Sequence, residues 1–373
     1  MTEPSNRQEP TEPIEQIQPM DVPESKGQTD PVEPSGHSAR DIKRDYKSIC
    51  RKLGLIMCLY FVCRIIGGSI SSVIFGHADV IGHTAAHILG MTVVVIFVYI
   101  IPMLVTALMF GSMSYYNIRS VQFRKLYEKP ERLARAIGTF PAMYGLGYGV
   151  ALLTLLLSFL ISRATGGQTF IEDILRPTTI ETTTSLGSAL VMVFVLVVIA
   201  PIFEEIWVRG IMYDALKPYG TGIAIIISSI IFGLMHGSLY MLFYTTALGF
   251  ALGYVRYATN SLLIVTILHA MINAVAAGML FMMTMTEITM EESVIVNTVQ
   301  NVYILAVLAL IIVGIIAFIV RIPTIRRYKL ENSWNSVSGG RKTALFFFSI
   351  PAIIMLVLAF NELTNYWLIS LIL

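Results

Sequence analysis

The sequence has few charged residues. Only 13% of its 373 residues are Asp, Glu, Lys or Arg, whereas 55% are hydrophobic. A soluble globular domain carries about 25% charged residues. The shortage excludes an ordinary soluble domain and indicates an integral membrane protein, because runs of roughly 20 apolar residues can span the hydrocarbon as helices. The net charge of +2 is too small to indicate a nucleic-acid partner.

Cysteine is also scarce, and one common metal-binding motif is missing. The three cysteines, Cys50, Cys58 and Cys63, lie in or beside the first apolar run. An odd number of cysteines in lipid is a poor disulfide framework, so we interpret them as free thiols. The chain contains no HExxH, the helical zinc motif of many metalloproteases.

The first forty residues differ from the rest. Residues 1–40 are rich in Pro, Glu and Gln and have almost no aromatic character. Such a segment cannot bury enough apolar area to offset the entropy lost on ordering. It also lacks the basic and apolar regions of a signal peptide. We therefore predict a disordered tail at 1–40 and a transmembrane helical domain at 41–373.

The rest of the chain contains long apolar segments separated by polar connections. They predict an all-α, polytopic bundle of about nine membrane spans. The apolar segments are 53–75, 84–110, 137–162, 186–215, 222–237, 239–257, 261–284, 299–320 and 343–371.

The basic residues are concentrated in three regions. Eighteen of the 26 Lys and Arg residues lie at 40–52, 119–135 and 321–342. With nine spans, these three regions fall on the same side of the membrane. The positive-inside rule then predicts a cytoplasmic N-terminus. We expect a multi-pass protein of a bacterial plasma membrane, with the lipid bilayer as a partner.

The stretch "VLVVIAPIFEEIWVRGIM" places three charges in an apolar segment. Glu205 and Arg209 are i and i+4 on one helix face, with the acid first, which favours an ion pair. Glu204 points about 100° away from Glu205 and has no partner in its own helix. The two adjacent glutamates therefore need different explanations.

Two further polar motifs lie in later apolar segments. "FGLMHG" places Phe232 and His236 at i and i+4, and "HAMINA" does the same for His269 and Asn273. A charge at the bilayer centre costs at least ~2.5–3.5 kcal/mol on insertion scales. The cheapest arrangement brings these polar groups together with Glu204, because each then helps to satisfy the others.

A carboxylate, two histidines and an amide could hydrolyse a bond. Glu204 could take a proton from water while His236 orients that water. His269 and Asn273 could donate to a developing oxyanion. Glu204, His236 and His269 could instead hold a zinc ion. Because Asn is an unusual zinc ligand, the metal-free mechanism is slightly preferred.

A second histidine pair lies near the start of another segment. "GHTAAH" places His83 and His87 at i and i+4, with His77 nearby, and this spacing would suit a metal ion. However, no Glu follows on that face, and the position is at the outer interface, where histidine costs little. A metal site there is the weaker interpretation.

Taken in order, the motifs EExxxR, FxxxH and HxxxN resemble the CPBP family, which groups type II CAAX prenyl endopeptidases with bacteriocin-processing or immunity (Abi) proteins. The resemblance covers roughly 186–284, the predicted catalytic core. It implies a helical intramembrane endopeptidase with a compact core of eight helices and a cavity open to the cytosolic side, so that a ninth helix and the tail would be additions. The family is called a metalloprotease, although a metal-free glutamate mechanism is also argued for it.

The resemblance also implies roles for individual residues. Glu204 resembles the catalytic glutamate, and His236 shares its water. His269 and Asn273 resemble the oxyanion-stabilising pair. Glu205 and Arg209 match the motif positions read above as an ion pair, and Phe232 is a packing residue of its motif.

Three functions remain open. The first is an intramembrane protease acting on a membrane-associated peptide or protein. The second is a non-catalytic immunity or scaffold relative, although a peptide binder has no need of a base such as Glu204. The third is a proton-coupled transporter, although such folds often contain inverted repeats and none is evident here. The oligomeric state is not encoded in any of these patterns.

Overall fold

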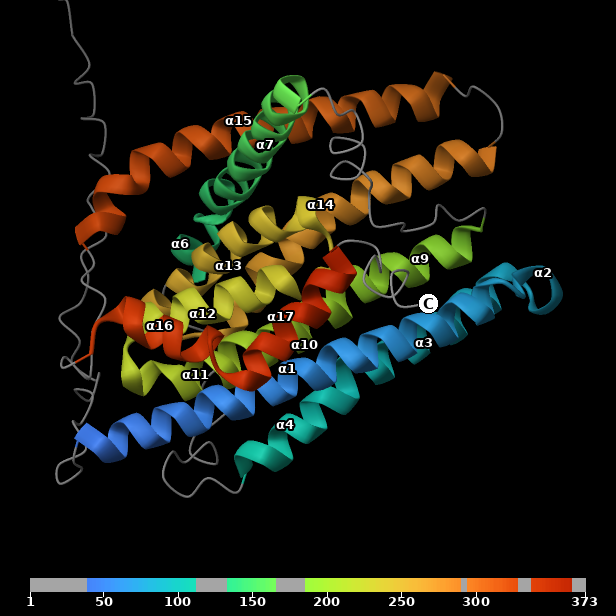
Figure 1. Cartoon of the computed structure of the whole chain (residues 1–373). Helices are drawn as coiled ribbons and strands as arrows, with labels where there is room; N and C mark the ends of the chain where they lie inside the picture. Colours follow the sequence, from blue (N-terminus) through green and yellow to red (C-terminus); the bar gives the residue numbers. More distant parts are fainter. Residues whose placement is uncertain (1–38, 112–132, 166–184, 290–293, 328–336, 364–373) are drawn as a thin grey trace, which may run out of the picture.

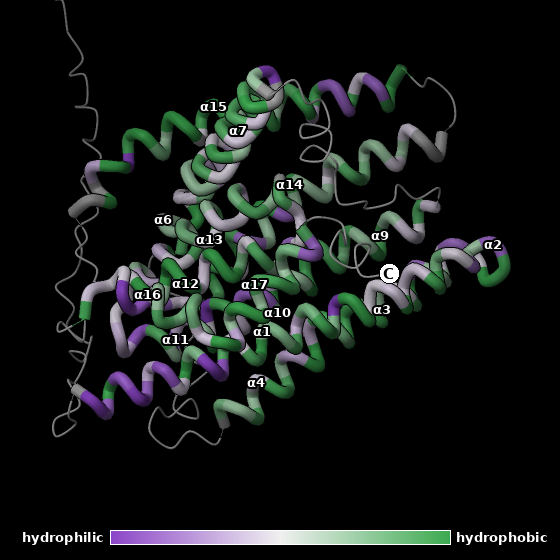
Figure 2. Tube along the Cα trace, in the orientation of Figure 1, coloured by the Kyte–Doolittle hydropathy of each residue, from purple (hydrophilic) through white to green (hydrophobic). Residues whose placement is uncertain are grey.

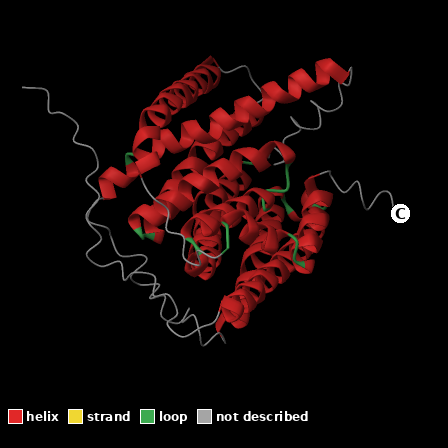
Figure 3. Ribbon diagram, turned by 60° about the vertical axis from the view of Figure 1, so that its left-hand side comes forward, coloured by secondary structure: helices red, strands yellow, loops and turns green. Residues whose placement is uncertain are grey.

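The computed structural model describes residues 39–111, 133–165, 185–289, 294–327 and 337–363. Every regular element in these ranges is a helix (Figure 3). The prediction of an all-α polytopic membrane fold is confirmed. The predicted tail lies outside the described residues except for its last two positions, Ala39 and Arg40, which already belong to the first helix.

Several helices contain short segments of π or 3₁₀ geometry, which divide them into named pieces. In chain order the elements are α1 (Ala39–Phe75), α2 (Ala78–Ile81), α3 (His83–Val94), η1 (Val95–Ile100), α4 (Ile101–Gly111), α6 (Leu133–Ile137), α7 (Phe140–Thr165), α9 (Leu186–Phe194), η3 (Val195–Ile199), α10 (Ala200–Glu205), η4 (Ile206–Met212), α11 (Tyr213–Leu216), η5 (Lys217–Tyr219), α12 (Thr221–Leu234), α13 (Leu239–Thr259), α14 (Leu262–Thr289), α15 (Val294–Arg327), α16 (Gly339–Phe347) and α17 (Ile350–Leu363).

Fewer than nine of the described helices are long and apolar enough to cross a membrane. In the described part of the chain there are six such helices, or up to seven if α16 and α17, which meet at a bend of 71°, form one span. The count of nine is therefore not confirmed. α12 has only 14 residues, about 21 Å of helix, which is shorter than the ~30 Å hydrocarbon. α13 is longer, but its tyrosines, threonines and Arg256 make it less apolar.

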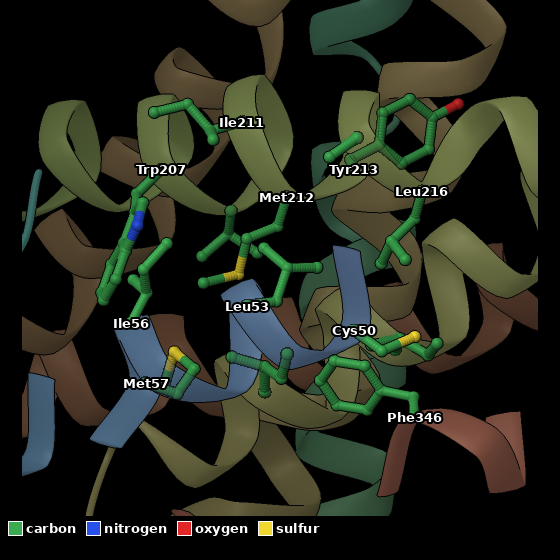
Figure 4. Packing of buried hydrophobic residues seen from close by; sticks show 14 of the residues in the cluster. Cys50, Leu53, Ile56, Met57, Trp207, Ile211, Met212, Tyr213, Leu216 and Phe346 are labelled. Atoms are coloured by element: carbon green, nitrogen blue, oxygen red, sulfur yellow. The ribbon is translucent and has the colours of Figure 1, made fainter. Parts of the chain in front are cut away.

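The buried side chains form two separate cores. The first core joins α1 to η4, α11, α12, α16 and α17. Figure 4 shows part of it, where Leu53 and Met57 of α1 meet Trp207 and Met212 of η4. The second core joins α7, α13, α14 and α15. α10, which carries the two adjacent glutamates, continues directly into η4 and also packs on α14, so it lies where the two cores meet.

The outer helices present apolar side chains to their surroundings. α7 and α15 pack against each other on one side of the molecule (Figure 1). The two helices approach so closely at Gly145 that a Cβ on this residue would overlap the backbone of Gly314. Figure 2 shows that α15 is apolar along most of its middle, and Leu305 and Ile312 there are exposed. Exposed apolar side chains on a helix of this length are expected to face lipid.

Two glycines let α13 pack closely against α12. A Cβ on Gly249 would lie 3.0 Å from Cα of Ser229, and a Cβ on Gly253 would lie 3.2 Å from Cγ2 of Ile225. The two glycines are four residues apart on one face of α13, a spacing that favours close helix packing.

All three cysteines, Cys50, Cys58 and Cys63, are free.

Candidate active site

Glu205 and Arg209 form a fully buried ion pair. Arg209 Nη1 lies 3.2 Å from Glu205 Oε1, and both side chains are 0% exposed. The other end of the guanidinium donates to the carbonyl of Gly249, at 3.3 Å. The guanidinium also lies over the ring of Phe232, 4.2 Å from its centroid, which adds a cation–π contact. The arginine therefore binds α10 to both α12 and α13.

Glu204 occupies a different environment. Its side chain is 12% exposed, whereas that of Glu205 is completely buried. The hydroxyl of Tyr99 donates to Glu204 Oε1 at 3.0 Å. Tyr99 lies in η1, the π-helical part of the second long helix, and its ring also packs against Phe203. Glu204 is thus the accessible acid of the adjacent pair.

His269 lies between the two glutamates. Its Nδ1 is 2.8 Å from Glu205 Oε1, and its Nε2 is 3.8 Å from Glu204 Oε2. A carboxylate can only accept, so Nδ1 carries a proton when Glu205 is ionised. This contact changes the sequence-based view of Glu205. The residue partners a histidine of another helix as well as Arg209.

His236 lies just beyond the end of α12. Its Nδ1 is 2.7 Å from the carbonyl of Phe232, so Nδ1 is the donor and Nε2 is left as an acceptor in the neutral ring. The Phe232 ring meets His236 and His269 edge to face, with centroids 4.9 and 5.4 Å away. His236 is also close enough to Glu204 to interact with it electrostatically. Phe232 therefore spaces the two histidines as well as filling the core.

Asn273 is positioned by the main chain. Its amide nitrogen donates to the carbonyl of Leu196 at 2.9 Å. Leu196 lies in η3, where π geometry changes the carbonyl pairing of the helix. Within the described part of the chain, this bond goes to a main-chain carbonyl rather than to Glu204 or a histidine. Because an amide has two N–H donors, Asn273 keeps one for another group.

Sequence reasoning missed four polar residues around this cluster. They are Tyr60, Arg64, Tyr99 and Glu362. Arg64 and Glu362 are charges inside the apolar segments 53–75 and 343–371, and an ionisable residue in a membrane segment is itself a functional signal. The two tyrosines carry no such signal, because tyrosine is common in membrane helices.

The candidate metal ligands do not converge on one point. Among the residues that the structure describes, no three His, Cys, Asp or Glu side chains are arranged to hold one ion. The possible set Glu204, His236 and His269 does not form a ligand cluster in this geometry.

The second histidine pair does not converge on a common point either. His83 Nε2 lies 3.5 Å from Asp79, whose side chain is 95% exposed. His87 Nδ1 lies 3.0 Å from the carbonyl of His83. These are local contacts at a helix start. They do not support a metal site at this histidine pair.

One comparison with known proteins identifies a family. Residues 186–275 match the family model described as type II CAAX prenyl endopeptidase Rce1-like. The matched range contains all three motifs, and it confirms the resemblance found in the sequence. This segment is therefore similar to the CAAX-type intramembrane proteases, which hydrolyse peptide bonds. No curated protein and no solved structure matches the chain.

Proposed function

From its Rce1-like segment at residues 186–275, we propose that this membrane protein is an endopeptidase that cleaves a membrane-associated peptide or protein, with Glu204 as the general base. The observation that carries the proposal is the difference between the adjacent glutamates. Glu205 is fully buried between Arg209 and His269, whereas Glu204 is partly exposed beside His269. Only Glu204 is accessible to water and substrate.

The positions of the donors and acceptors support a hydrolysis in which Glu204 is the base. Water oxygen attacks the carbonyl carbon of the scissile peptide while Glu204 takes one water proton. Nε2 of His236 accepts a hydrogen bond from the same water and orients it. Glu204 then passes its proton to the leaving nitrogen as the C–N bond breaks, which releases an amine and a carboxylic acid.

His269 and Asn273 stabilise the negative charge on the tetrahedral intermediate. Protonated His269 has an N–H on both ring nitrogens. Glu205 holds the Nδ1 proton, and Nε2 can then donate to the oxyanion. The second N–H of Asn273 supplies the other donor, and preorganised donors of this kind contribute strongly to catalysis. Glu205 therefore supports catalysis through His269 without touching the substrate.

Tyr99 complements this arrangement from outside the matched segment. Its hydroxyl occupies Oε1 of Glu204, which leaves Oε2 on the side of His269 to meet the water. A hydrogen bond to a charged group is worth about 1.5–3 kcal/mol. Tyr99 thus fixes the orientation of the base.

A cleavage assay on the purified full-length chain tests the proposal. We would use two quenched fluorogenic peptides of the same sequence, one of which carries an S-prenyl group on a cysteine fourth from its C-terminus. Cleavage by the wild type and its loss in Glu204→Ala and Glu204→Gln, with the melting temperature retained, would support it. Asp79→Ala, which removes an exposed carboxylate, is the matched control. Full cleavage by Glu204→Ala would refute it.

Chelator and zinc arms of the same assay address the metal. We expect cleavage to be unchanged by a chelator, because Glu204, His236 and His269 do not form a ligand set. Loss of cleavage with a chelator and recovery with zinc would favour a metal mechanism instead. Comparison of the two peptides shows whether the substrate must be prenylated.

The proposal includes an orientation. The basic regions at 40–52, 119–135 and 321–342 support a cytoplasmic N-terminus, and a bacterial plasma membrane is the expected location. Fusions of a fluorescent reporter or a periplasmic phosphatase to the N-terminus test this. Fluorescence without phosphatase activity is expected, and the reverse would overturn the orientation.

A further inference from the structure

The helix that carries His236 ends abruptly beside the site. α12 ends at Leu234, and Gly237 follows with φ of +61°, the left-handed conformation that commonly ends a helix. The last carbonyls of a helix have no partner within it. The orientation of His236 therefore depends on what binds the carbonyls of this turn.

α1 supplies the donors. The guanidinium of Arg64 donates through Nη1 to the carbonyl of Met235 and through Nη2 to the carbonyl of His236, the latter at 3.4 Å. The hydroxyl of Tyr60 donates to the same Met235 carbonyl at 3.2 Å. Two side chains one helical turn apart on α1 thus cap the end of α12 from outside.

α17 supplies the charge that balances Arg64. Glu362 Oε2 lies 2.9 Å from Arg64 Nε, and the Glu362 side chain is only 4% exposed. An unpaired charge in a membrane segment is costly, so each member of this pair favours burial of the other. The pair connects the first and last described helices at the turn that bears His236.

The fit between the pair and the turn is close. A Cβ on Gly237 would collide with the guanidinium of Arg64 and would lie 2.9 Å from Glu362 Oε2. Glycine is therefore required at this position both by its backbone conformation and by the space that the pair leaves. The turn and the pair constrain each other.

We propose that Arg64 and Glu362 are positioning residues that hold His236 in its catalytic orientation, so that activity depends on the docking of α17. This inference rests on the proposed function, because the proposed hydrolysis requires His236 to be held in one orientation. Neither side chain touches the reacting atoms in this scheme. Arg64 acts through the main chain of His236, and Glu362 acts through Arg64.

Kinetics of Arg64 and Glu362 variants test the proposal, with the same fluorogenic peptides. We expect Arg64→Met to lower kcat by about 10²-fold with little change in KM, since a small misplacement of a catalytic group has this effect. Arg64→Lys keeps a charged donor and should recover part of that loss. Arg44→Met, which breaks the exposed Arg44–Asp41 pair on the same helix, is the matched control and should leave kcat unchanged.

A double variant separates positioning from charge balance. Arg64→Met combined with Glu362→Leu removes both charges, so we expect the melting temperature to stay near that of the wild type. kcat should remain low, because the carbonyls of Met235 and His236 have lost their donor. Recovery of kcat in the double variant would show that the pair only balances charge, which overturns the proposal.

Two further measurements keep the proposal testable. If the double variant does not fold, Glu362→Gln, which keeps the shape of the side chain, should still lower kcat roughly tenfold, and a kcat equal to that of the wild type would overturn the proposal. Glu204→Ala distinguishes the two proposals. If Glu204→Ala is inactive while Arg64→Met keeps full kcat, the positioning role fails and the proposed function stands.

Discussion

Two ion pairs flank the candidate site, and they are built in opposite ways. Glu205–Arg209 lies within one helix, four residues apart, and both side chains are 0% exposed. Arg64–Glu362 joins α1 to α17, and its arginine is 29% exposed. The local pair reaches His269 through a side chain, whereas the long-range pair reaches His236 through main-chain carbonyls. Each of the two histidines is thus in contact with one member of an ion pair.

The comparison indicates how the two histidines are controlled. Glu205 binds the ring nitrogen of His269 directly, so it fixes the orientation of that ring. Arg64 binds the carbonyls around His236, so it acts on the position of that residue through the main chain. Loss of the first pair is expected to affect folding most, since both members are inaccessible to water. Loss of the second is expected to affect turnover most.

The largest expected effect on folding is that of Glu205→Ala. It leaves Arg209 buried without its acid, and breaking a buried pair in this way costs about 3–5 kcal/mol. We expect a low yield of folded protein and a lowered melting temperature in detergent. A melting temperature equal to that of the wild type would contradict the buried pair.

Glu205→Ala combined with Arg209→Met sharpens this prediction. Removal of both charges should recover most of the melting temperature, because an apolar replacement of a buried pair is often neutral. Cleavage should remain impaired, since His269 has lost the partner of its Nδ1. If the double variant regains full cleavage, Glu205 has no role beyond the ion pair.

An intermediate effect is expected for Tyr99→Phe, which removes one hydrogen bond to Glu204 and keeps the ring. A bond to a charged group is worth about 1.5–3 kcal/mol, so we expect kcat to fall by about 10- to 150-fold, with KM and melting temperature little changed. Tyr46→Phe is the control. It removes an equivalent buried hydroxyl, which donates to the carbonyl of Lys342. Equal kcat values for both variants would rule out a special role for Tyr99.

The smallest effect concerns the packing beside Arg209. Gly249→Ala places a Cβ 3.0 Å from the Ser229 backbone, and overpacking of this kind typically costs about 1–3 kcal/mol. Gly253→Ala places its Cβ 3.2 Å from Cγ2 of Ile225, a side-chain atom rather than a main-chain atom, so a smaller loss is expected. Melting temperatures of the two variants check the order, and a larger loss for Gly253→Ala would contradict this packing.

Much of the fold could be predicted from the sequence, but the number of spans could not. Apolar runs reveal helices because a backbone in lipid must satisfy its own hydrogen bonds. The same runs do not distinguish a lipid-spanning helix from a short buried one. α12 is apolar but only 14 residues long and mostly buried, and it packs against α13 and α16. Its length, and not its composition, separates it from the spanning helices.

The candidate site, too, could be predicted from the sequence only in part. Spacing alone places Glu205 beside Arg209, His236 beside Phe232, and Glu204 on another face, because i and i+4 residues share a side of a helix. The contact between Glu205 and His269 and the support of Glu204 by Tyr99 come from separate helices. No local pattern encodes such contacts.

The sequence by itself determined that this is a helical membrane protein, which residues form its three motifs, and which family that motif order matches. Those properties depend on composition and on the helical repeat, and both can be read along the chain. Only the tertiary structure decided that Glu205 is buried while Glu204 is accessible, and that Arg64 and Glu362 meet at the turn bearing His236. The physical reason is that burial and long-range pairing depend on how helices distant in the chain pack together.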